Sequence, residues 1–151
     1  MYEIITNKAL VIPAGVWVIS QVLKVLVVLA REKRLDLRFL VGSGGMPSSH
    51  TALVCSLATV VGMTQGFGSV VFAVVAILAM VVMYDAAGVR RAVGRQSAIL
   101  NRIVKELLEK RPRDEVERDL REFIGHTPFQ VIAGAVLGIS IAWLWLTVSG
   151  G

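Results

Sequence analysis

His50 and His126 are the two histidines of the chain, and both stand where a helix is expected to begin. Pro47 lies shortly before the first and Pro128 shortly after the second, and proline suits the first turn of a helix. The N–H groups and the positive dipole end of a helix N-terminus favour an anion such as phosphate. A histidine at that position can act as a nucleophile or as a general acid, so the pair predicts phosphoryl transfer.

Residues 42–50 add further groups that suit a phosphate. Three glycines, among them Gly45, let the backbone approach a ligand closely and adopt a positive φ. Ser48 and Ser49 can cap the following helix, and their N–H groups can hold phosphoryl oxygens. The simpler interpretation, an ordinary glycine loop followed by a helix cap, is compatible with the same residues.

Lys24 and Arg31 are the candidate cations of the first apolar stretch. They are seven residues apart, which is two helical turns along one face, and Gln21 shares that face because it lies three residues before Lys24. An ionisable side chain inside an apolar run is costly and usually functional, so we expect Lys24 to bind an anion. The alternative is that Lys24 extends to the membrane surface.

Asp85, Arg90 and Arg91 follow the longest uncharged run of the chain. Such a group at the edge of a membrane is either an ion pair or part of a binding site. Alone, it would suggest a solvated helix end. Because it is expected on the same side of the membrane as the glycine loop, we regard Asp85 and one of the two arginines as candidate site residues.

The elements that must position these residues are apolar. Hydrophobic residues make up 55% of the 151 residues, and mean hydropathy is +0.69. Residues 39–84 contain no Asp, Glu, Lys or Arg, which allows two membrane spans joined by a glycine-rich turn at 62–68. We predict an all-α, polytopic membrane helix bundle forming a single domain, 1–151, with a cytoplasmic polar helical segment at 86–125. About four transmembrane helices are expected, at 9–30, 47–62, 67–85 and 128–148.

The basic residues predict the orientation of this bundle. Of 16 Lys and Arg, four lie in 31–38 and ten in 90–121. With four spans, both segments fall on one side, which the positive-inside rule makes cytoplasmic. We therefore expect an integral protein of the cell (inner) membrane with its site facing the cytoplasm. Eight carboxylates interleave with the bases at 85–122, which argues against a nucleic-acid partner. Cys55 lies in an apolar run and suggests no disulfide.

These motifs resemble the type 2 phosphatidic acid phosphatase superfamily, which includes the vanadium haloperoxidases. Lys24 to Arg31 matches its first motif except for a proline, which is Glu32 here, and residues 47–50 match its second with Ser49 for glycine. In the third motif, histidine, proline and glycine match, but Gln130 stands where the superfamily has aspartate and Leu120 where it has serine. Residues 44–50 and 84–91 are more similar to its divergent branch of small bacterial and plastid membrane proteins.

The resemblance implies a role for each candidate residue. His126 would attack phosphorus and His50 would protonate the leaving group. Gln130, in the aspartate position, can bind an imidazole but supplies no charge, so Asp85 is the candidate substitute. The implied phosphate ligands are Lys24, Arg31, Gly45, Ser48, Ser49, and Arg90 or Arg91.

The expected function is therefore a metal-independent lipid phosphatase or pyrophosphatase, with no cofactor. Its partners would be the bilayer and a phospholipid or prenyl phosphate substrate, such as phosphatidylglycerophosphate, phosphatidate or a polyprenyl phosphate. A homo-oligomer is left open. The alternative suggested by Gln130 is a non-catalytic lipid-phosphate binder, carrier or scaffold. A haloperoxidase-type vanadate enzyme fits a short membrane-embedded chain poorly.

Overall fold

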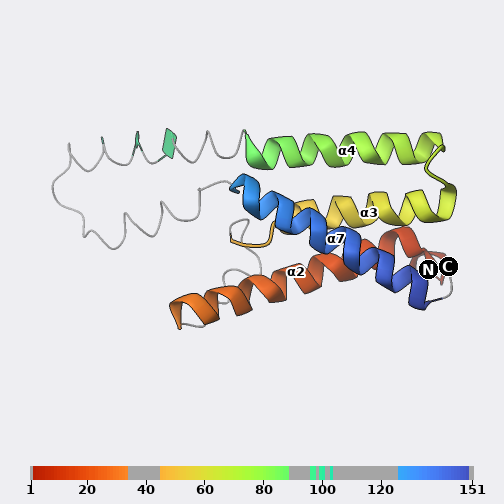
Figure 1. Cartoon of the computed structure of the whole chain (residues 1–151), viewed down its shortest axis with the longest axis horizontal. Helices are drawn as coiled ribbons and strands as arrows, with labels where there is room; N and C mark the ends of the chain where they lie inside the picture. The colour runs from red at the N-terminus through yellow and green to blue at the C-terminus, as the bar shows by residue number, and fades with distance from the viewer. Residues whose placement is uncertain are drawn as a thin grey trace.

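The computed structural model describes residues 2–33, 45–88, 126–149 and positions 96, 97, 99, 100 and 103 (Figure 1). Over these residues the chain is helical and contains no strand, so the predicted all-α class is confirmed. Most of the predicted cytoplasmic segment, 86–125, lies outside the described residues. The helices are α1 (Tyr2–Thr6), α2 (Lys8–Glu32), α3 (Ser49–Gln65), α4 (Val70–Ala87) and α7 (Pro128–Val148).

Four long helices occupy the four expected spans, and three of them are long and apolar enough to cross a membrane. These three are α2, over Lys8–Ala30, α4 and α7. With 17 residues, α3 is shorter than the roughly 20 residues that usually span a bilayer. The chain is a helical membrane bundle, while the count of four complete spans stays a prediction.

Local capping explains where the long helices begin. The side chains of Asn7, Ser48, Ser69 and Thr127 each accept a hydrogen bond from a backbone N–H in the first turn of α2, α3, α4 and α7, respectively. Each satisfies a donor that the helix leaves without an internal partner. Ser48, one of the two serines expected to cap the helix after the glycine loop, is thus the cap of α3.

The turn between α3 and α4 is shorter than the sequence suggests. A turn was expected over 62–68, but α3 continues to Gln65 and the chain reverses at Gly66, whose φ is +86°. The physical reason lies at Gly62, where a Cβ atom would clash with the ring of Phe67. Gly62 therefore makes room for an aromatic side chain rather than ending the helix.

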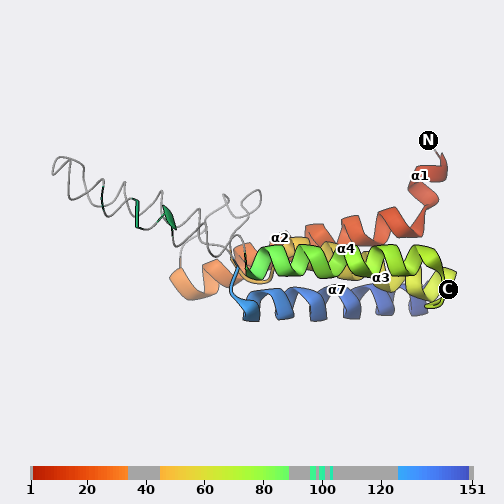
Figure 2. The same ribbon diagram turned by 90° about the horizontal axis from the view of Figure 1, so that it is seen from above.

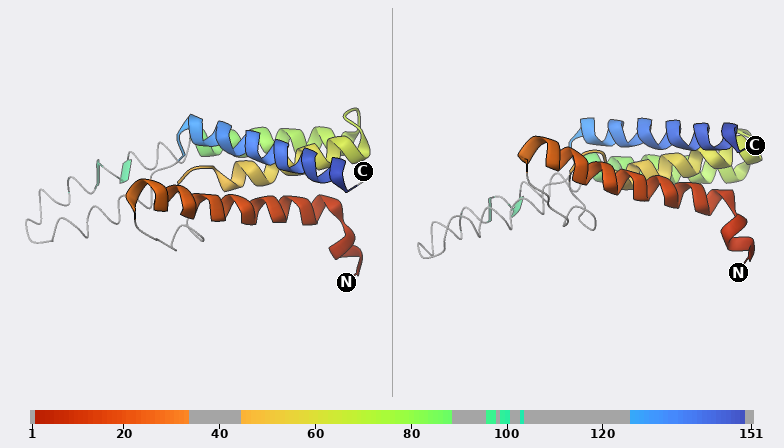
Figure 3. Two further views of the ribbon diagram at one scale, coloured as in Figure 1. Left: turned by 60° about the horizontal axis from the view of Figure 1, so that its bottom comes forward. Right: turned by 90° about the horizontal axis from the view of Figure 1, so that it is seen from below.

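The long helices run antiparallel to their sequence neighbours, with α3 in contact with α2, α4 and α7 (Figures 1 and 3). The short α1 turns away from the bundle near the N-terminus (Figure 2). The C-terminal ends of α2 and α4 and the N-terminal ends of α3 and α7 lie at one end of the bundle (Figure 1). Both chain termini and the α3–α4 turn lie at the other end.

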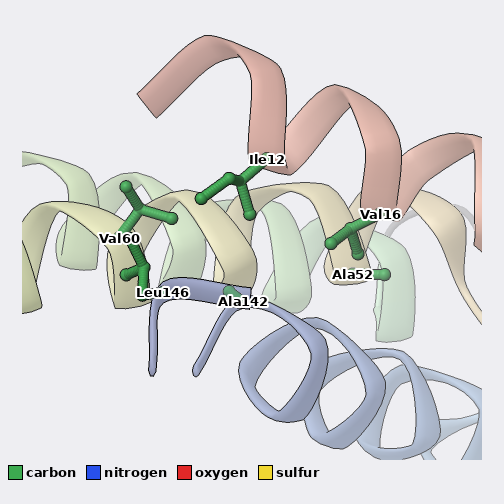
Figure 4. Close-up of a cluster of buried hydrophobic side chains, with 6 residues drawn as sticks. All are labelled: Ile12, Val16, Ala52, Val60, Ala142 and Leu146. Carbon is green, nitrogen blue, oxygen red and sulfur yellow. The ribbon is translucent and has the colours of Figure 1, made fainter. Parts of the chain in front are cut away.

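The buried core of the described bundle involves all four long helices, because Val54 and Cys55 of α3 also pack against Ala79 of α4. One buried cluster joins α2, α3 and α7 through Ile12, Val16, Ala52, Val60, Ala142 and Leu146 (Figure 4). The outward face of α4 is apolar as well: Val70 is 80% exposed and Val74 62%. Apolar side chains on the outside of a helix that is apolar throughout are expected where lipid, and not water, surrounds the bundle.

Candidate active site

The first turn of α3 is fixed to its surroundings by Ser48. The Ser48 hydroxyl oxygen accepts hydrogen bonds from the Thr51 N–H at 3.4 Å and from the Thr51 hydroxyl at 3.0 Å. The Ser48 N–H donates to the main-chain carbonyl of Gln130 at 3.1 Å. A backbone bond between segments so far apart in the sequence sets the position of the start of α3 against the start of α7.

Lys24 reaches this helix start from α2. Its ammonium donates to the Ser49 hydroxyl at 2.9 Å, and both residues are buried, with exposed fractions of 0% and 1%. The side chain therefore packs into the bundle and does not extend to the membrane surface. A buried cation within an apolar span is a strong indication of a functional site, because holding a charge there is costly unless an anion or polar groups surround it.

His126 is held at the start of α7 by Gln130. The His126 side chain is buried, and its Nδ1 lies 3.3 Å from the Gln130 side-chain oxygen Oε1. That same oxygen accepts the Thr127 N–H at 2.9 Å, while the Gln130 N–H donates to the Thr127 hydroxyl at 3.3 Å. The result is a reciprocal capping box, which the sequence pattern Thr-x-x-Gln permits.

The capping box determines the tautomer of His126. A backbone N–H can only donate, so the Gln130 atom that faces Thr127 must be the carbonyl oxygen and not the amide nitrogen. The same oxygen faces Nδ1, and an oxygen of this kind only accepts, so the contact favours the tautomer that carries the proton on Nδ1. In the neutral ring the lone pair is then on Nε2, which is the atom expected to act as a nucleophile.

Together these contacts form one polar connection across three helices. It runs from Lys24 on α2 to Ser49, through the neighbouring Ser48 to the Gln130 carbonyl, and through the Gln130 side chain to His126. Five of the residues proposed from sequence are thus joined. Ser48 and Ser49, expected to cap the helix and to offer N–H groups, take part in these contacts through their hydroxyls.

The remaining candidates are His50, Gly45 and Asp85, which the structure describes, and three arginines. His50 follows Ser49 in α3 and is half-buried, as are Gly45, with a φ of +87°, and Asp85, near the C-terminal end of α4. The end of α4 lies at the same end of the bundle as the start of α7 (Figure 1). Arg90, Arg91 and the Arg31 side chain lie outside the described part of the chain.

Two polar residues on α2 were not assigned a role from sequence. Ser20 and Gln21 are 0% and 5% exposed, although they lie in an apolar span. The Ser20 hydroxyl donates to the Trp17 carbonyl of its own helix at 2.7 Å. The signal that could have identified Gln21 is its spacing of three residues from Lys24, which puts both on the buried face.

The residues of the described ranges contain no group of three or more His, Cys, Asp or Glu side chains arranged to hold a metal ion. The polar groups that come together are instead a cation, hydroxyls and an imidazole held through Nδ1. This set can bind a phosphoryl group and supply a nitrogen nucleophile.

Known proteins resemble this chain over most of its length. The family model described as the divergent PAP2 family matches residues 5–141. The uncharacterized membrane protein YuiD of Bacillus subtilis is 36% identical over 146 residues, which cover 91% of this chain and 92% of the Bacillus protein. No solved structure matches the chain. The family match covers both histidines and the whole of α2, α3 and α4, and the chain belongs to the divergent PAP2 family.

Proposed function

We propose that this protein is a membrane lipid phosphatase or pyrophosphatase that hydrolyses a phosphomonoester or diphosphate lipid through a phosphohistidine at His126. The observation that carries the proposal is the Gln130–His126 contact, because it leaves the lone pair of the imidazole on Nε2. Family membership supports a phosphatase-like protein, and the buried Lys24–Ser49 pair supports an anionic ligand beside the nucleophile.

The proposed reaction has two steps. In the first, His126 Nε2 attacks phosphorus, the bond from phosphorus to the leaving oxygen breaks, and His50 gives that oxygen a proton. In the second, water attacks the phosphohistidine, His50 takes a proton from the water, and inorganic phosphate leaves as His126 is restored. Charge gathers on the phosphoryl oxygens in both transition states, where the Lys24 ammonium and the N–H groups at the start of α3 stabilise it.

The substrate enters from the bilayer in this proposal. The outer faces of the helices are apolar and suit acyl or prenyl chains, while α3 and α7, which carry the proposed site residues at their starts, both begin at one end of the bundle. The positive-inside rule assigns that end to the cytoplasm. The lipid's chains would lie along the bundle and its phosphate beside Lys24.

The test is phosphate release from purified variants in detergent, with phosphatidate, phosphatidylglycerophosphate and a polyprenyl phosphate as substrates. His126→Ala is expected to lower turnover by at least about a thousandfold because it removes the nucleophile. His50→Ala should lower it by about a hundred- to ten-thousandfold, as expected for a lost general acid. Thr64→Ala is the control, because the Thr64 hydroxyl donates to the Val60 carbonyl of its own helix, near the end of α3 opposite to Ser48. Full activity in both histidine variants would reject the proposal.

A second candidate function is a lipid-phosphate binder or carrier without turnover, which the neutral Gln130 favours. It predicts saturable binding that depends on Lys24, together with no phosphate release and no phosphohistidine. Vanadate separates the two candidates, since it mimics the transition state of phosphoryl transfer. Turnover that vanadate inhibits supports the enzyme, and binding without turnover supports the carrier.

A further inference from the structure

Gln21 presents a buried hydrogen-bond acceptor next to the proposed phosphate site. It is 5% exposed, and its side-chain oxygen Oε1 has no hydrogen-bond partner within the described ranges 2–33, 45–88 and 126–149. A buried amide oxygen without a partner is unfavourable in an apolar bundle, so native proteins rarely retain one without a use. A ligand that carries a hydrogen-bond donor could supply the partner of this oxygen.

The position of Gln21 relative to Lys24 limits what that donor can be. The two residues lie three positions apart on the buried face of α2, so Gln21 is about 4.5 Å farther along the helix axis at 1.5 Å per residue. The direction from Lys24 to Gln21 runs toward the N-terminal end of α2, away from the end of the bundle where α3 and α7 begin (Figure 1). A lipid whose phosphate lies at Lys24 would place the carbons next to its phosphoester beside Gln21.

The chemistry of common lipid phosphates then distinguishes among them. A prenyl chain has no hydrogen-bond donor, and the ester groups of phosphatidate only accept hydrogen bonds. A glycerol hydroxyl next to the phosphoester can donate to Gln21 Oε1. Such a hydroxyl occurs in lysophosphatidate, on the acylated glycerol, and in phosphatidylglycerophosphate, on the terminal glycerol.

We infer that Gln21 is a specificity-determining residue that accepts a hydrogen bond from a glycerol hydroxyl adjacent to the phosphomonoester of the lipid. The preferred ligands are hydroxylated glycerol phosphate lipids, and lipids without that hydroxyl bind more weakly because they leave the buried oxygen without a partner. The inference rests on the proposed function for the kind of ligand, and it concerns binding, which is measurable without turnover.

The experiment compares two lipids that differ by one hydroxyl: 1-oleoyl-glycerol 3-phosphate and its 2-deoxy analogue. Dissociation constants are measured for the full-length protein in detergent. The unaltered protein should bind the hydroxylated lipid about ten- to a hundredfold more tightly, as expected for one buried hydrogen bond. The dissociation constants of phosphatidylglycerophosphate and phosphatidate are also compared, which shows whether a hydroxyl on a diacyl lipid strengthens binding in the same way.

Variants assign the preference to Gln21. Gln21→Met has a similar size and no amide oxygen, so the ratio of the two dissociation constants should fall to about one. Gln21→Glu keeps an acceptor oxygen and should retain the preference, although its charge weakens binding of both phosphates. Ser20→Ala is the matched control: Ser20 is the neighbouring buried polar residue, and its hydroxyl is already bonded to the Trp17 carbonyl.

Each result has one meaning. Equal affinity of the unaltered protein for the two lipids overturns the inference, even if Gln21→Met does not fold. A preference that survives in a folded Gln21→Met protein overturns it as well. Absence of phosphate release with the hydroxyl preference intact would instead reject the catalytic proposal and leave the role of Gln21 standing.

Discussion

Gln130 serves both as a helix cap and as the partner of the proposed nucleophile. Its side-chain oxygen accepts from the Thr127 N–H and from His126 Nδ1. The same atom therefore orients the imidazole and completes the capping box at the start of α7. An aspartate at this position would add a negative charge that stabilises the imidazolium and phosphohistidine forms. The glutamine amide is neutral, so it favours the same tautomer without adding that charge. Its hydrogen bond to His126 is therefore expected to be weaker, since bonds between neutral groups are roughly half as strong as charge-assisted ones.

This dual role leads to opposite expectations for two substitutions. Gln130→Glu keeps the capping box and adds the charge, so turnover should rise about ten- to a hundredfold for roughly 1–3 kcal/mol of transition-state stabilisation. Gln130→Met removes the acceptor, and turnover should fall by a similar factor. Steady-state phosphate release in detergent measures both.

Two controls accompany these variants. Thr127→Ala removes the hydroxyl half of the capping box and keeps the Gln130–His126 contact, so it should lower stability more than turnover. Asp85→Asn tests whether the carboxylate on α4 supplies the missing charge. Unchanged activity in Gln130→Glu, Gln130→Met and Asp85→Asn would mean that none of these side chains orients His126.

At the level of helices, two glycines of α7 determine how closely it packs against α3. A Cβ at Gly134 would clash with the Ser48 carbonyl oxygen, and one at Gly138 would clash with the Ala52 carbonyl oxygen. Small residues four apart allow close helix packing in membranes, where helix association depends on contact between the helices. The bond between the Ser48 N–H and the Gln130 carbonyl depends on this close approach.

Enlarging either glycine should therefore separate α3 from α7. Gly138→Ala is expected to lower the free energy of unfolding by about 1–3 kcal/mol, because the clash is with backbone that cannot rotate away. Gly134→Ala should lower stability similarly and also reduce activity, since Ser48 would move. Thermal unfolding followed by circular dichroism measures both, with Gly68→Ala as the control because a Cβ there meets open space. Unchanged melting temperatures in both α7 variants would contradict this account of the packing.

For the whole molecule, the two ends of the bundle differ in character. The starts of α3 and α7, to which Ser48, Ser49 and His126 belong, lie at one end, and the chain termini and the α3–α4 turn lie at the other (Figure 1). The basic segments 31–38 and 90–121 follow α2 and α4, whose C-terminal ends are at the polar end. The positive-inside rule therefore predicts that the proposed site faces the cytoplasm.

Cysteine labelling tests this orientation. In a Cys55→Ala background, cysteines at Gly68 and Ser149 should react with a membrane-impermeant reagent applied to spheroplasts. A cysteine at Glu115, in the charged segment, should react only after the membrane is opened. The reverse pattern would place the site outside the cytoplasm.

The sequence by itself determined the helical class, the approximate helix positions and the family. Lengths of apolar runs and the residues that begin a helix are local properties, so Ser48 and Pro128 could be assigned to helix starts before any contact was known. The two histidines and Lys24 were recognisable because each residue type is unusual in its surroundings.

Only the tertiary structure decided which of these residues meet. Lys24 and Ser49 are 25 positions apart, and their contact depends on how α2 packs against α3. The tautomer of His126 follows from a shared Gln130 oxygen, and the role of Gly62 follows from the ring of Phe67. Gln21 showed no more than a helical spacing in the sequence, because whether an amide oxygen finds a partner depends on every helix packed around it.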